Sequence, residues 1–132
     1  MGGIKMSKRI MVVDDDAITI KMCDFILKKF EYEVVTMNSG IAALDYLRNP
    51  ESAPIDLIFL DIEMPLLNGF NTLSSIRQST ALKDIPVVFL TATATKETVA
   101  EAIRLGVTSY IKKPFKPQER INKAQEILGS AE

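Results

Sequence analysis

The sequence predicts a single α/β domain in which helices cover both faces of a five-stranded parallel sheet. Five short apolar runs alternate with five segments of helical periodicity along the 132 residues, and such alternation indicates right-handed crossovers between parallel strands. The run Leu57–Leu60 is apolar at every position, which is typical of a strand buried on both faces of a parallel sheet. We therefore expect a doubly wound sheet with one core, which a chain of this length can bury without disulfides.

The expected strands are short runs that are rich in β-branched and aromatic residues, which favour extended structure. They are Arg9–Val13, Val34–Met37, Leu57–Leu60, Pro86–Leu90 and Ser109–Ile111. The expected helices follow the strands one by one, at about Ala17–Phe30, Gly40–Arg48, Gly69–Gln78, Lys96–Leu105 and Pro117–Leu128. Asn38 or Ser39 is expected to cap the second helix, and Gly106 to end the fourth.

The helical period predicts which side chains of each helix face the sheet. In the first helix these are Thr19, Cys23, Ile26 and Phe30, flanked by Met22 and Leu27, while Lys21, Asp24 and Lys28 point away. In the four later helices they are Ile41, Leu44 and Leu47; Phe70, Leu73 and Ile76; Val99, Ala100 and Ile103; and Ile121, Ala124 and Leu128.

The composition excludes several classes of function. With 16 basic and 17 acidic residues the net charge is -1, which gives no electrostatic footprint for direct nucleic-acid binding. No apolar run has the length of a membrane span, and no signal peptide is recognisable. The single cysteine, Cys23, excludes an internal disulfide and fits a reducing cytoplasm. The chain has no histidine, so it cannot carry Ser–His or Cys–His catalysis. Residues 1–8 are expected to be a flexible leader.

Polar side chains stand where four of the expected strands end. Asp14 and Asp15 follow the first strand, Asp61 the third, Thr91 the fourth and Lys113 the fifth. The carboxyl ends of parallel strands lie along one edge of a sheet, where open α/β sheets bind ligands. Taken singly, each of these residues is more often a solvated turn, a cap or a surface charge. Their convergence at one edge is the observation that favours a site.

Three carboxylates at one edge require a cation. At an effective dielectric of about 20, two carboxylates about 4 Å apart repel by roughly 4 kcal/mol. Oxygen ligands without His or Cys select Mg²⁺ rather than zinc or copper. Together with Lys113, one Mg²⁺ would balance the three negative charges of Asp14, Asp15 and Asp61, so that the site as a whole would have a formal charge of zero. A carboxylate beside Mg²⁺ and an ammonium can attack phosphorus and become an acyl phosphate.

In this order of strand-end residues the sequence resembles the receiver domain of two-component response regulators, of the stand-alone kind that acts in chemotaxis. The resemblance runs from Arg9 to Leu128 and is most specific in four segments. These are Val12-Val13-Asp14-Asp15-Asp16, Leu60-Asp61-Ile62-Glu63-Met64-Pro65 with Asn68-Gly69, Phe89-Leu90-Thr91-Ala92, and Tyr110-Ile111-Lys112-Lys113-Pro114-Phe115. It implies a flavodoxin-like fold with strand order 2-1-3-4-5, and a receiver domain at residues 9–129.

The resemblance also implies a role for each strand-end residue. Asp61 would accept a phosphoryl group from a sensor histidine kinase or a histidine phosphotransfer protein. Asp15, Asp61 and the main-chain carbonyl of Glu63 would bind Mg²⁺ directly, and Asp14 would hold it through water. Thr91 and Lys113 would contact the phosphoryl group. Tyr110 would be an aromatic switch residue that responds to Thr91, and Asp16 would be only a solvated charge.

Two surfaces are expected to bind partner proteins. Ile18, Met22 and Phe25 form an apolar stripe at the border of the first helix, beside which a phosphodonor protein would dock. A downstream target would bind a second face, formed by the fourth helix, the fifth strand and the fifth helix. Its residues include Lys96, Ala100, Arg104, Tyr110 and Lys116.

Two other interpretations remain open from the sequence. The first is an aspartyl-phosphate phosphatase on a similar scaffold, because Asp14 and Asp16 fit the Asp-x-Asp start of such enzymes. That interpretation needs an acyl phosphate on Asp14, a Thr or Val where Ile18 stands, and a cap domain for which the chain has no room. The second is a degenerate receiver that acts only as a scaffold, against which the set of Asp61, Thr91 and Lys113 argues. A receiver would turn over only its own aspartyl phosphate and would not be an enzyme.

Overall fold

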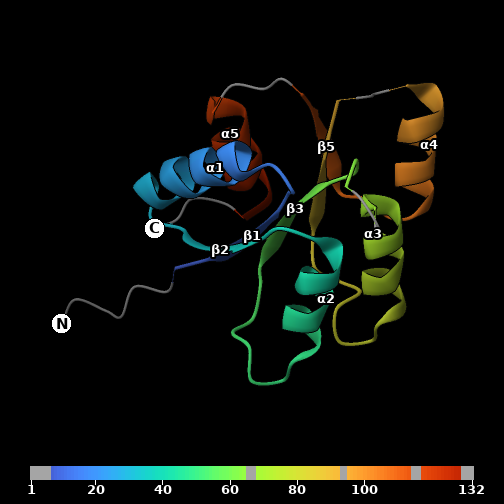
Figure 1. Cartoon of the computed structure of the whole chain (residues 1–132), viewed down its shortest axis with the longest axis horizontal. Helices are drawn as coiled ribbons and strands as arrows, with labels where there is room; N and C mark the ends of the chain where they lie inside the picture. Colours follow the sequence, from blue (N-terminus) through green and yellow to red (C-terminus); the bar gives the residue numbers. More distant parts are fainter. Residues whose placement is uncertain (1–6, 65–67, 93–94, 114–116, 129–132) are drawn as a thin grey trace.

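The computed structural model describes residues 7–64, 68–92, 95–113 and 117–128 and contains one parallel five-stranded sheet. Its strands are β1 (Arg9–Val13), β2 (Glu33–Met37), β3 (Leu57–Asp61), β4 (Val87–Thr91) and β5 (Ser109–Lys112). They lie in the order β2-β1-β3-β4-β5, and every adjacent pair is parallel. The expected fold class and strand order are therefore confirmed (Figure 1).

Five helices cover the sheet on both faces. They are α1 (Ala17–Lys29), α2 (Gly40–Arg48), α3 (Gly69–Gln78), α4 (Lys96–Arg104) and α5 (Pro117–Leu128). Helices α1 and α5 lie on one face, and α2, α3 and α4 on the other (Figure 1). Among the described residues, no helix has both the length and the apolar character that a membrane crossing needs.

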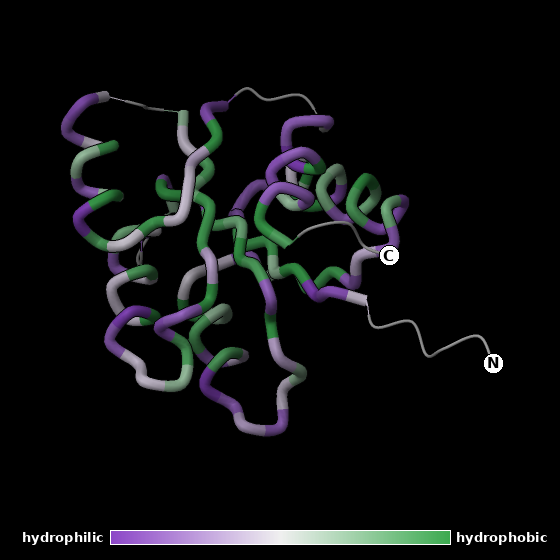
Figure 2. The backbone as a smooth tube through the Cα atoms, turned by 180° about the vertical axis from the view of Figure 1, so that it is seen from behind, coloured by the Kyte–Doolittle hydropathy of each residue, from purple (hydrophilic) through white to green (hydrophobic). Residues whose placement is uncertain are grey.

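The central strands β3 and β4 are buried on both faces, as the apolar run predicted. All five residues of each strand are buried. Ile58, Leu60 and Phe89 pack with the core under α2 and α3, whereas Leu57 and Phe59 pack with the core under α1 and α5. Hydrophobic segments accordingly run through the middle of the molecule in Figure 2. A strand buried in this way presents only its last residue, Asp61, to a site at the edge of the sheet.

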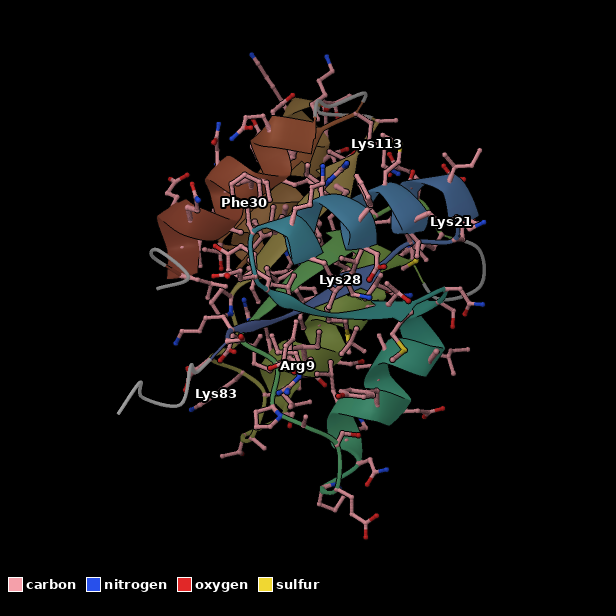
Figure 3. The ribbon with its side chains drawn as sticks, turned by 90° about the vertical axis from the view of Figure 1, so that its left-hand side faces the viewer. Arg9, Lys21, Lys28, Phe30, Lys83 and Lys113 are labelled. Atoms are coloured by element: carbon pink, nitrogen blue, oxygen red, sulfur yellow. The ribbon has the colours of Figure 1, made fainter. Side chains whose placement is uncertain are left out.

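Some inward positions were predicted wrongly. Phe30 lies beyond the end of α1 and is 37% exposed (Figure 3), while Leu27, expected at the flank, is fully buried. Ile41 of α2 is 50% exposed, and in α4 both Ala100 and Ile103 lie on the exposed side. Apolar residues occur around much of these helices, so periodicity alone does not decide the buried face.

The residues that are buried instead are mostly small. Ala43 of α2 and Ala102 of α4 are almost fully covered, and they belong to the same core as α3. A small side chain lets a helix lie close to the sheet, so packing selects these positions over the larger Ile41 and Ile103. The inward residues Leu73, Ile76, Ile121 and Ala124 of α3 and α5 are fully buried, as predicted. Ser39, rather than Asn38, caps α2 and accepts the amide hydrogen of Ala42 at 3.1 Å.

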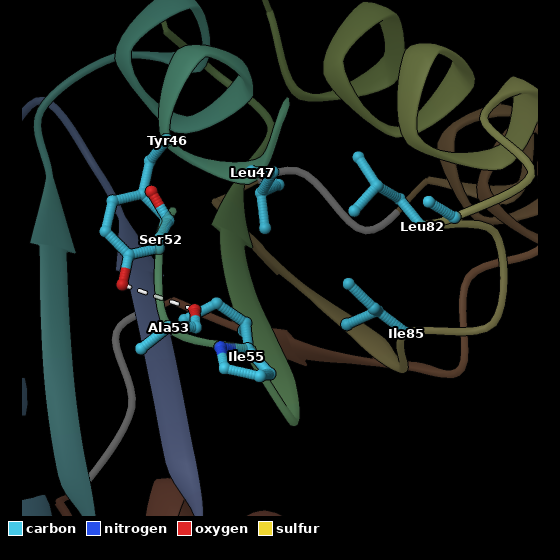
Figure 4. A pocket seen from close by; sticks show the side chains of 9 residues that line it. Tyr46, Leu47, Ser52, Ala53, Ile55, Leu82 and Ile85 are labelled. Carbon is cyan, nitrogen blue, oxygen red and sulfur yellow. Dashed lines mark hydrogen bonds between the residues drawn. The ribbon is translucent and has the colours of Figure 1, made fainter. Parts of the chain in front are cut away.

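At the amino-terminal end of the sheet, the side chain of Arg77 forms hydrogen bonds to the connections that precede β4 and β5. Its guanidinium donates to the main-chain oxygens of Lys83 (2.9 Å) and Ile85 (2.7 Å), before β4, and of Gly106 (2.8 Å), before β5. The same end carries a hollow of about 180 Å³ between α2 and the connections that precede β3 and β4 (Figure 4). The described residues of its lining are mostly apolar and include no carboxylate or cationic side chain. The hydroxyl of Tyr46 donates there to the oxygen of Ala53 at 3.3 Å. The charged cluster described below lies at the opposite end of the strands.

Gly69, the first residue of α3, allows this helix to start against the end of β3. A Cβ at this position would lie 2.5 Å from the main-chain oxygen of Asp61 and 2.7 Å from the Cα of Ile62. We expect Gly69→Ala to lower the free energy of unfolding by about 2–4 kcal/mol, because backbone rather than a flexible side chain must move.

The matched control is Gly106→Ala, where the nearest atom is the Nε of Arg77 at 3.2 Å and φ is +85°. Strain in the left-handed region should cost this variant only about 1 kcal/mol. Urea denaturation of both variants measures the difference. A Gly69→Ala protein as stable as the Gly106→Ala protein would contradict the close approach of α3 to β3.

Candidate functional site

Three carboxylates meet at the carboxyl-terminal end of the sheet. Asp14 directly follows β1 and Asp61 ends β3, and these two strands are neighbours. One carboxylate oxygen from each of Asp14, Asp15 and Asp61 can be chosen so that all three lie within 4.8 Å of one another. Asp14 and Asp61 are buried, and Asp15 is exposed. Two desolvated charges and one solvent-facing charge form an oxygen-rich cluster that a metal ion can reach from solvent.

The carboxylate of Asp14 is held by two partners. Its Oδ1 accepts the amide hydrogen of Asp16 at 2.9 Å, and its Oδ2 lies 3.3 Å from the Nζ of Lys113. The amide of Asp14 donates to the oxygen of Met37 at 3.1 Å, which extends the pairing of β1 with β2 by one residue. Asp14 is therefore fixed in place by the sheet, the following turn and a cation.

Asp16 is more than a solvated charge, and that expectation is corrected. Its carboxylate caps α1 by accepting the amide hydrogen of Ile18 at 3.1 Å and the hydroxyl of Thr19 at 2.7 Å. These hydrogen bonds, that from Thr19 first, lower the pKa of Asp16. The three aspartates after β1 therefore have different positions. Asp16 caps the helix, whereas Asp14 and Asp15 belong to the carboxylate cluster.

Lys113 places an ammonium between the two buried carboxylates. Its Nζ is 3.2 Å from Oδ1 of Asp61 and 3.3 Å from Oδ2 of Asp14. Its amide donates to the oxygen of Thr91, so the main chain stays joined to β4 while the side chain reaches over that strand. Burial by itself lowers the pKa of Lys113, but Asp14 and Asp61 outweigh it, and the net effect raises that pKa. The side chain is therefore a permanent cation of the cluster.

The pKa of Asp61 is raised although the ammonium of Lys113 lies next to it. Burial and then the charge of Asp14 raise the pKa of Asp61 to about 7, although Lys113 and the amide of Glu63 act in the opposite direction. The Glu63 amide donates to Oδ1 of Asp61 at 3.2 Å. A divalent cation would relieve this excess of negative charge and favour the ionised, nucleophilic form of Asp61. Carboxylate oxygens are ligands that suit a hard cation.

Thr91, at the end of β4, turns its hydroxyl toward Glu63. The residue is 1% exposed, and its Oγ1 donates to Oε1 of Glu63 at 3.0 Å. The amide of Ala92 donates to the same oxygen at 3.0 Å. The sequence placed Glu63 as a metal ligand through its main-chain carbonyl and at a position that in the family affects the lifetime of the phosphoryl group, but it did not predict this side-chain contact. No periodicity in the sequence indicates it, because it joins the connection after β3 to the end of β4, which is far away in the chain.

The expected target face is present only in part within the described residues. Tyr110 on β5 is 43% exposed, and with Lys96, Val99, Ala100 and Ile103 of α4 it lines a shallow hollow of about 380 Å³. Arg104 is also exposed and pairs with Glu101 on its own helix. Lys116 lies outside the described residues. The described part of this face therefore combines apolar and cationic side chains.

The expected stripe on α1 is exposed. Ile18 is 69%, Met22 47% and Phe25 63% exposed, and the Nζ of Lys29 lies 4.7 Å from the centre of the Phe25 ring. Cys23 and Leu27 hold the opposite side of this helix against the sheet. The helix thus carries two apolar surfaces, one of which is not covered by any described part of the chain.

The sequence analysis also missed Arg120 of α5, which is only 2% exposed. Burial lowers the pKa of Arg120, while the negative charges of Glu119 and Asp14 act in the opposite direction. The available signal was a basic residue four positions before Ala124, on the apolar face of the helix. It adds a buried cation to the layer that α1 and α5 form over one face of the sheet.

Comparison with known proteins gives one consistent family. Residues 10–125 match the family described as the response regulator receiver domain. A curated relative, the response regulator SaeR of Staphylococcus aureus (strain USA300), is 32% identical over 119 residues, which are 90% of this chain and 50% of SaeR. The chain thus spans about half the length of the curated relatives that it matches.

Two solved structures extend the likeness to the whole fold. The chemotaxis protein CheY4 of Vibrio cholerae matches with a TM-score of 0.86 and 28% identity, over 92% of this chain and 99% of CheY4. The phosphorylated cyanobacterial phytochrome response regulator RcpA matches with a TM-score of 0.85 and 28% identity, over 96% of this chain and 98% of RcpA. With the same sheet and an acidic cluster at its carboxyl-terminal end, the chain belongs to the family of response regulator receiver domains of two-component systems.

Proposed function

We propose that this chain is a signalling switch that accepts a phosphoryl group on Asp61 from the phosphohistidine of a sensor kinase or a phosphotransfer protein. The observation that carries the proposal is the position of Asp61, which is buried next to Asp14 with the ammonium of Lys113 at 3.2 Å. In a receiver domain, this arrangement supplies both a nucleophile and a cation for an incoming phosphoryl group.

The proposed reaction is a transfer between two residues. A carboxylate oxygen of Asp61 attacks phosphorus while the phosphorus–nitrogen bond of the donor breaks and the imidazole keeps the electron pair. The product is an acyl phosphate on Asp61, and attack by water on its phosphorus later returns the carboxylate and inorganic phosphate. Lys113 balances the negative charge that the phosphoryl oxygens bring. The chain then turns over only its own aspartyl phosphate, and it signals by altered protein binding.

We assign a Mg²⁺ site to the same cluster. Asp15, Asp61 and the main-chain carbonyl of Glu63 would bind the ion directly, and Asp14 would hold it through water. The exposed position of Asp15 suits an ion that keeps part of its water shell. When bound, Mg²⁺ would neutralise charge on the carboxylates and on the transferred phosphoryl group.

Two surfaces are assigned to partners in this proposal. The exposed stripe of Ile18, Met22 and Phe25 would receive the phosphodonor protein. The target would bind the face of Lys96, Ala100, Arg104, Tyr110 and Lys116, with Thr91 and Tyr110 as the switch residues that report on the phosphoryl group. We expect these contacts in the cytoplasm, in keeping with the free thiol of Cys23.

The phosphatase interpretation finds less support in the geometry. It would use Asp14 as the nucleophile, yet one oxygen of Asp14 accepts the Asp16 amide and the other faces Lys113. Asp16, the second aspartate of the Asp-x-Asp start, is engaged as the cap of α1. The degenerate interpretation is also disfavoured, because Asp61, Thr91 and Lys113 all stand at the carboxyl-terminal end of the sheet.

The first test of the proposal is the location of the phosphoryl group. With Mg²⁺ and acetyl phosphate the chain should gain one hydroxylamine-labile phosphoryl group, seen by intact-protein mass spectrometry. Asp61→Asn should abolish it and a chelator should prevent it, whereas Asp45→Asn, on the exposed surface of α2, should leave it unchanged. Unaltered labelling of Asp61→Asn would refute the assignment, and a label found on Asp14 would favour the phosphatase.

A second test uses the charge of Asp61. Its pKa is raised from 3.8 to about 7 in the folded chain, so between these values the folded state binds more protons than the unfolded state. Without metal, the contribution of Asp61 to stability is therefore greatest at low pH and is lost as the pH rises toward 7.

Urea denaturation in chelator should show this as a difference between variants. From pH 4 to pH 8 the wild type should lose about 2–4 kcal/mol relative to Asp61→Asn. Mg²⁺ should restore much of the loss in the wild type, because it binds the ionised cluster only in the folded chain. Equal pH dependence of the two proteins in chelator would show that Asp61 ionises normally.

A third test concerns the stripe on α1. Phe25→Ala should slow phosphorylation by the cognate kinase roughly tenfold, because an exposed aromatic at an interface commonly contributes more than 1 kcal/mol. Labelling by acetyl phosphate should not change. Ile41→Ala, which removes an exposed apolar side chain from α2, is the control and should alter neither rate. Equal slowing with both donors would mean that Phe25 supports the site or the fold, and not docking.

A further inference from the structure

Glu63 bridges the ends of the two central strands. Its amide donates to the carboxylate of Asp61 at 3.2 Å, and its own Oε1 accepts from the Thr91 hydroxyl and the Ala92 amide, each at 3.0 Å. We call this set of contacts the Glu63 bridge. The carboxylate of Glu63 is not one of the three that form the acidic cluster, which are those of Asp14, Asp15 and Asp61.

The bridge uses two neutral donors that stand beside Asp61. In the sheet, Asp61 is paired with Leu90, and the next two residues along the chain are Thr91, which ends β4, and Ala92, which follows it. Both donate to a single oxygen of Glu63. Thr91 is buried whereas Glu63 is exposed, so the carboxylate can leave the bridge for water while the hydroxyl cannot.

We propose that the Glu63 carboxylate is a built-in competitor of the phosphoryl group, and that it holds the Thr91 hydroxyl and the Ala92 amide away from Asp61 in the resting chain. The inference rests on the proposed phosphorylation of Asp61. Glu63 is in this sense a positioning residue, because it acts through Thr91 and Ala92 and takes no part in the transfer itself.

The competition has a physical basis in charge and in donor number. A phosphoryl group brings a charge of about −1.5 to −2 and three acceptor oxygens, whereas Glu63 offers one oxygen to the same two donors. The two anions also repel each other, so a phosphoryl group on Asp61 drives the Glu63 side chain into solvent. Until then the bridged conformer lowers the apparent affinity of the site for an anion, because only the open fraction is competent to bind.

The test measures binding of beryllofluoride, a phosphoryl mimic, in the presence of Mg²⁺. Isothermal calorimetry on the full chain compares the wild type with Glu63→Ala and Glu63→Gln. Glu63→Ala should tighten binding about tenfold, since two hydrogen bonds that must be broken are lost. Glu63→Gln keeps an acceptor oxygen without the charge, so its affinity should lie between those of the other two. Glu97→Ala removes an exposed carboxylate from the first turn of α4 and should leave the affinity nearly unchanged.

A second measurement detects the bridge without any ligand. In NMR spectra of the metal-free chain, the Ala92 amide proton should move upfield in Glu63→Ala and much less in Glu63→Gln. In a Thr91→Ala background, where one of the two donors is gone, Glu63→Ala should tighten beryllofluoride binding clearly less than tenfold.

Three results would overturn the inference alone. The first is an unchanged Ala92 resonance in Glu63→Ala, and the second is equal beryllofluoride affinity of the wild type and Glu63→Ala. The third is equally tighter binding by Glu63→Ala and Glu63→Gln, which would mean that Glu63 acts only through its charge. Failure of every variant and of the wild type to bind beryllofluoride and to label with acetyl phosphate would instead overturn the proposed function, and with it the competition.

Discussion

The contact on which the site depends is the ammonium of Lys113 between the carboxylates of Asp14 and Asp61, at 3.3 Å and 3.2 Å. Two buried carboxylates on neighbouring strands repel each other strongly where solvent is excluded. A cation shared by both makes their burial tolerable, and a buried cation is stable only beside such anions. The pair of carboxylates and Lys113 therefore require one another. Burial, and then the charge of Asp14, raise the pKa of Asp61 in spite of this ammonium, and a divalent ion would favour the ionised form of Asp61.

The parallel sheet makes this contact possible. Asp14 and Asp61 end adjacent strands, but β4 separates Lys113 from both. Only a long side chain can span that strand, and the hydrogen bond from the Lys113 amide to the Thr91 oxygen fixes where its stem begins. Gly69 completes the frame, because a helix that starts against the main chain of Asp61 holds the end of β3 in place. The rigid part of the site is thus built from strand ends, which suits a reaction that depends on position.

The Glu63 bridge is the movable part. The Glu63 carboxylate is exposed and lies in the connection after β3 rather than in a strand. Its Oε1 accepts hydrogen bonds from Thr91 and Ala92 at the end of β4. The two exposed surfaces proposed for partner binding lie outside this bridge. The stripe on α1 and the hollow between α4 and Tyr110 lie on helices of opposite faces of the sheet. The phosphodonor and the target that we propose for these two surfaces would therefore contact the chain on different sides.

The sequence by itself determined the five strands, their parallel arrangement and the residues at their ends, because these follow from apolar runs, from alternation with helices and from local chemistry. Helix faces were predicted best where apolar residues were confined to one stripe, as in α3 and α5, whereas in α1 and α2 the prediction was right for Cys23 and Leu44 but not for every residue. In α1, α2 and α4 the exposure of Phe30, Ile41 and Ile103 depended on how closely each helix lies against the sheet.

The tertiary structure alone decided the contacts between residues that are distant in the chain. The burial of Arg120, the reach of Lys113 to Asp14 and the Thr91–Glu63 hydrogen bond all join separate elements. A sequence pattern reports the period of one element at a time, whereas these contacts depend on the distance and orientation between elements. For that reason the sequence predicted which groups lie at the edge of the sheet, whereas only the tertiary structure decided which of them form hydrogen bonds and ion pairs with one another.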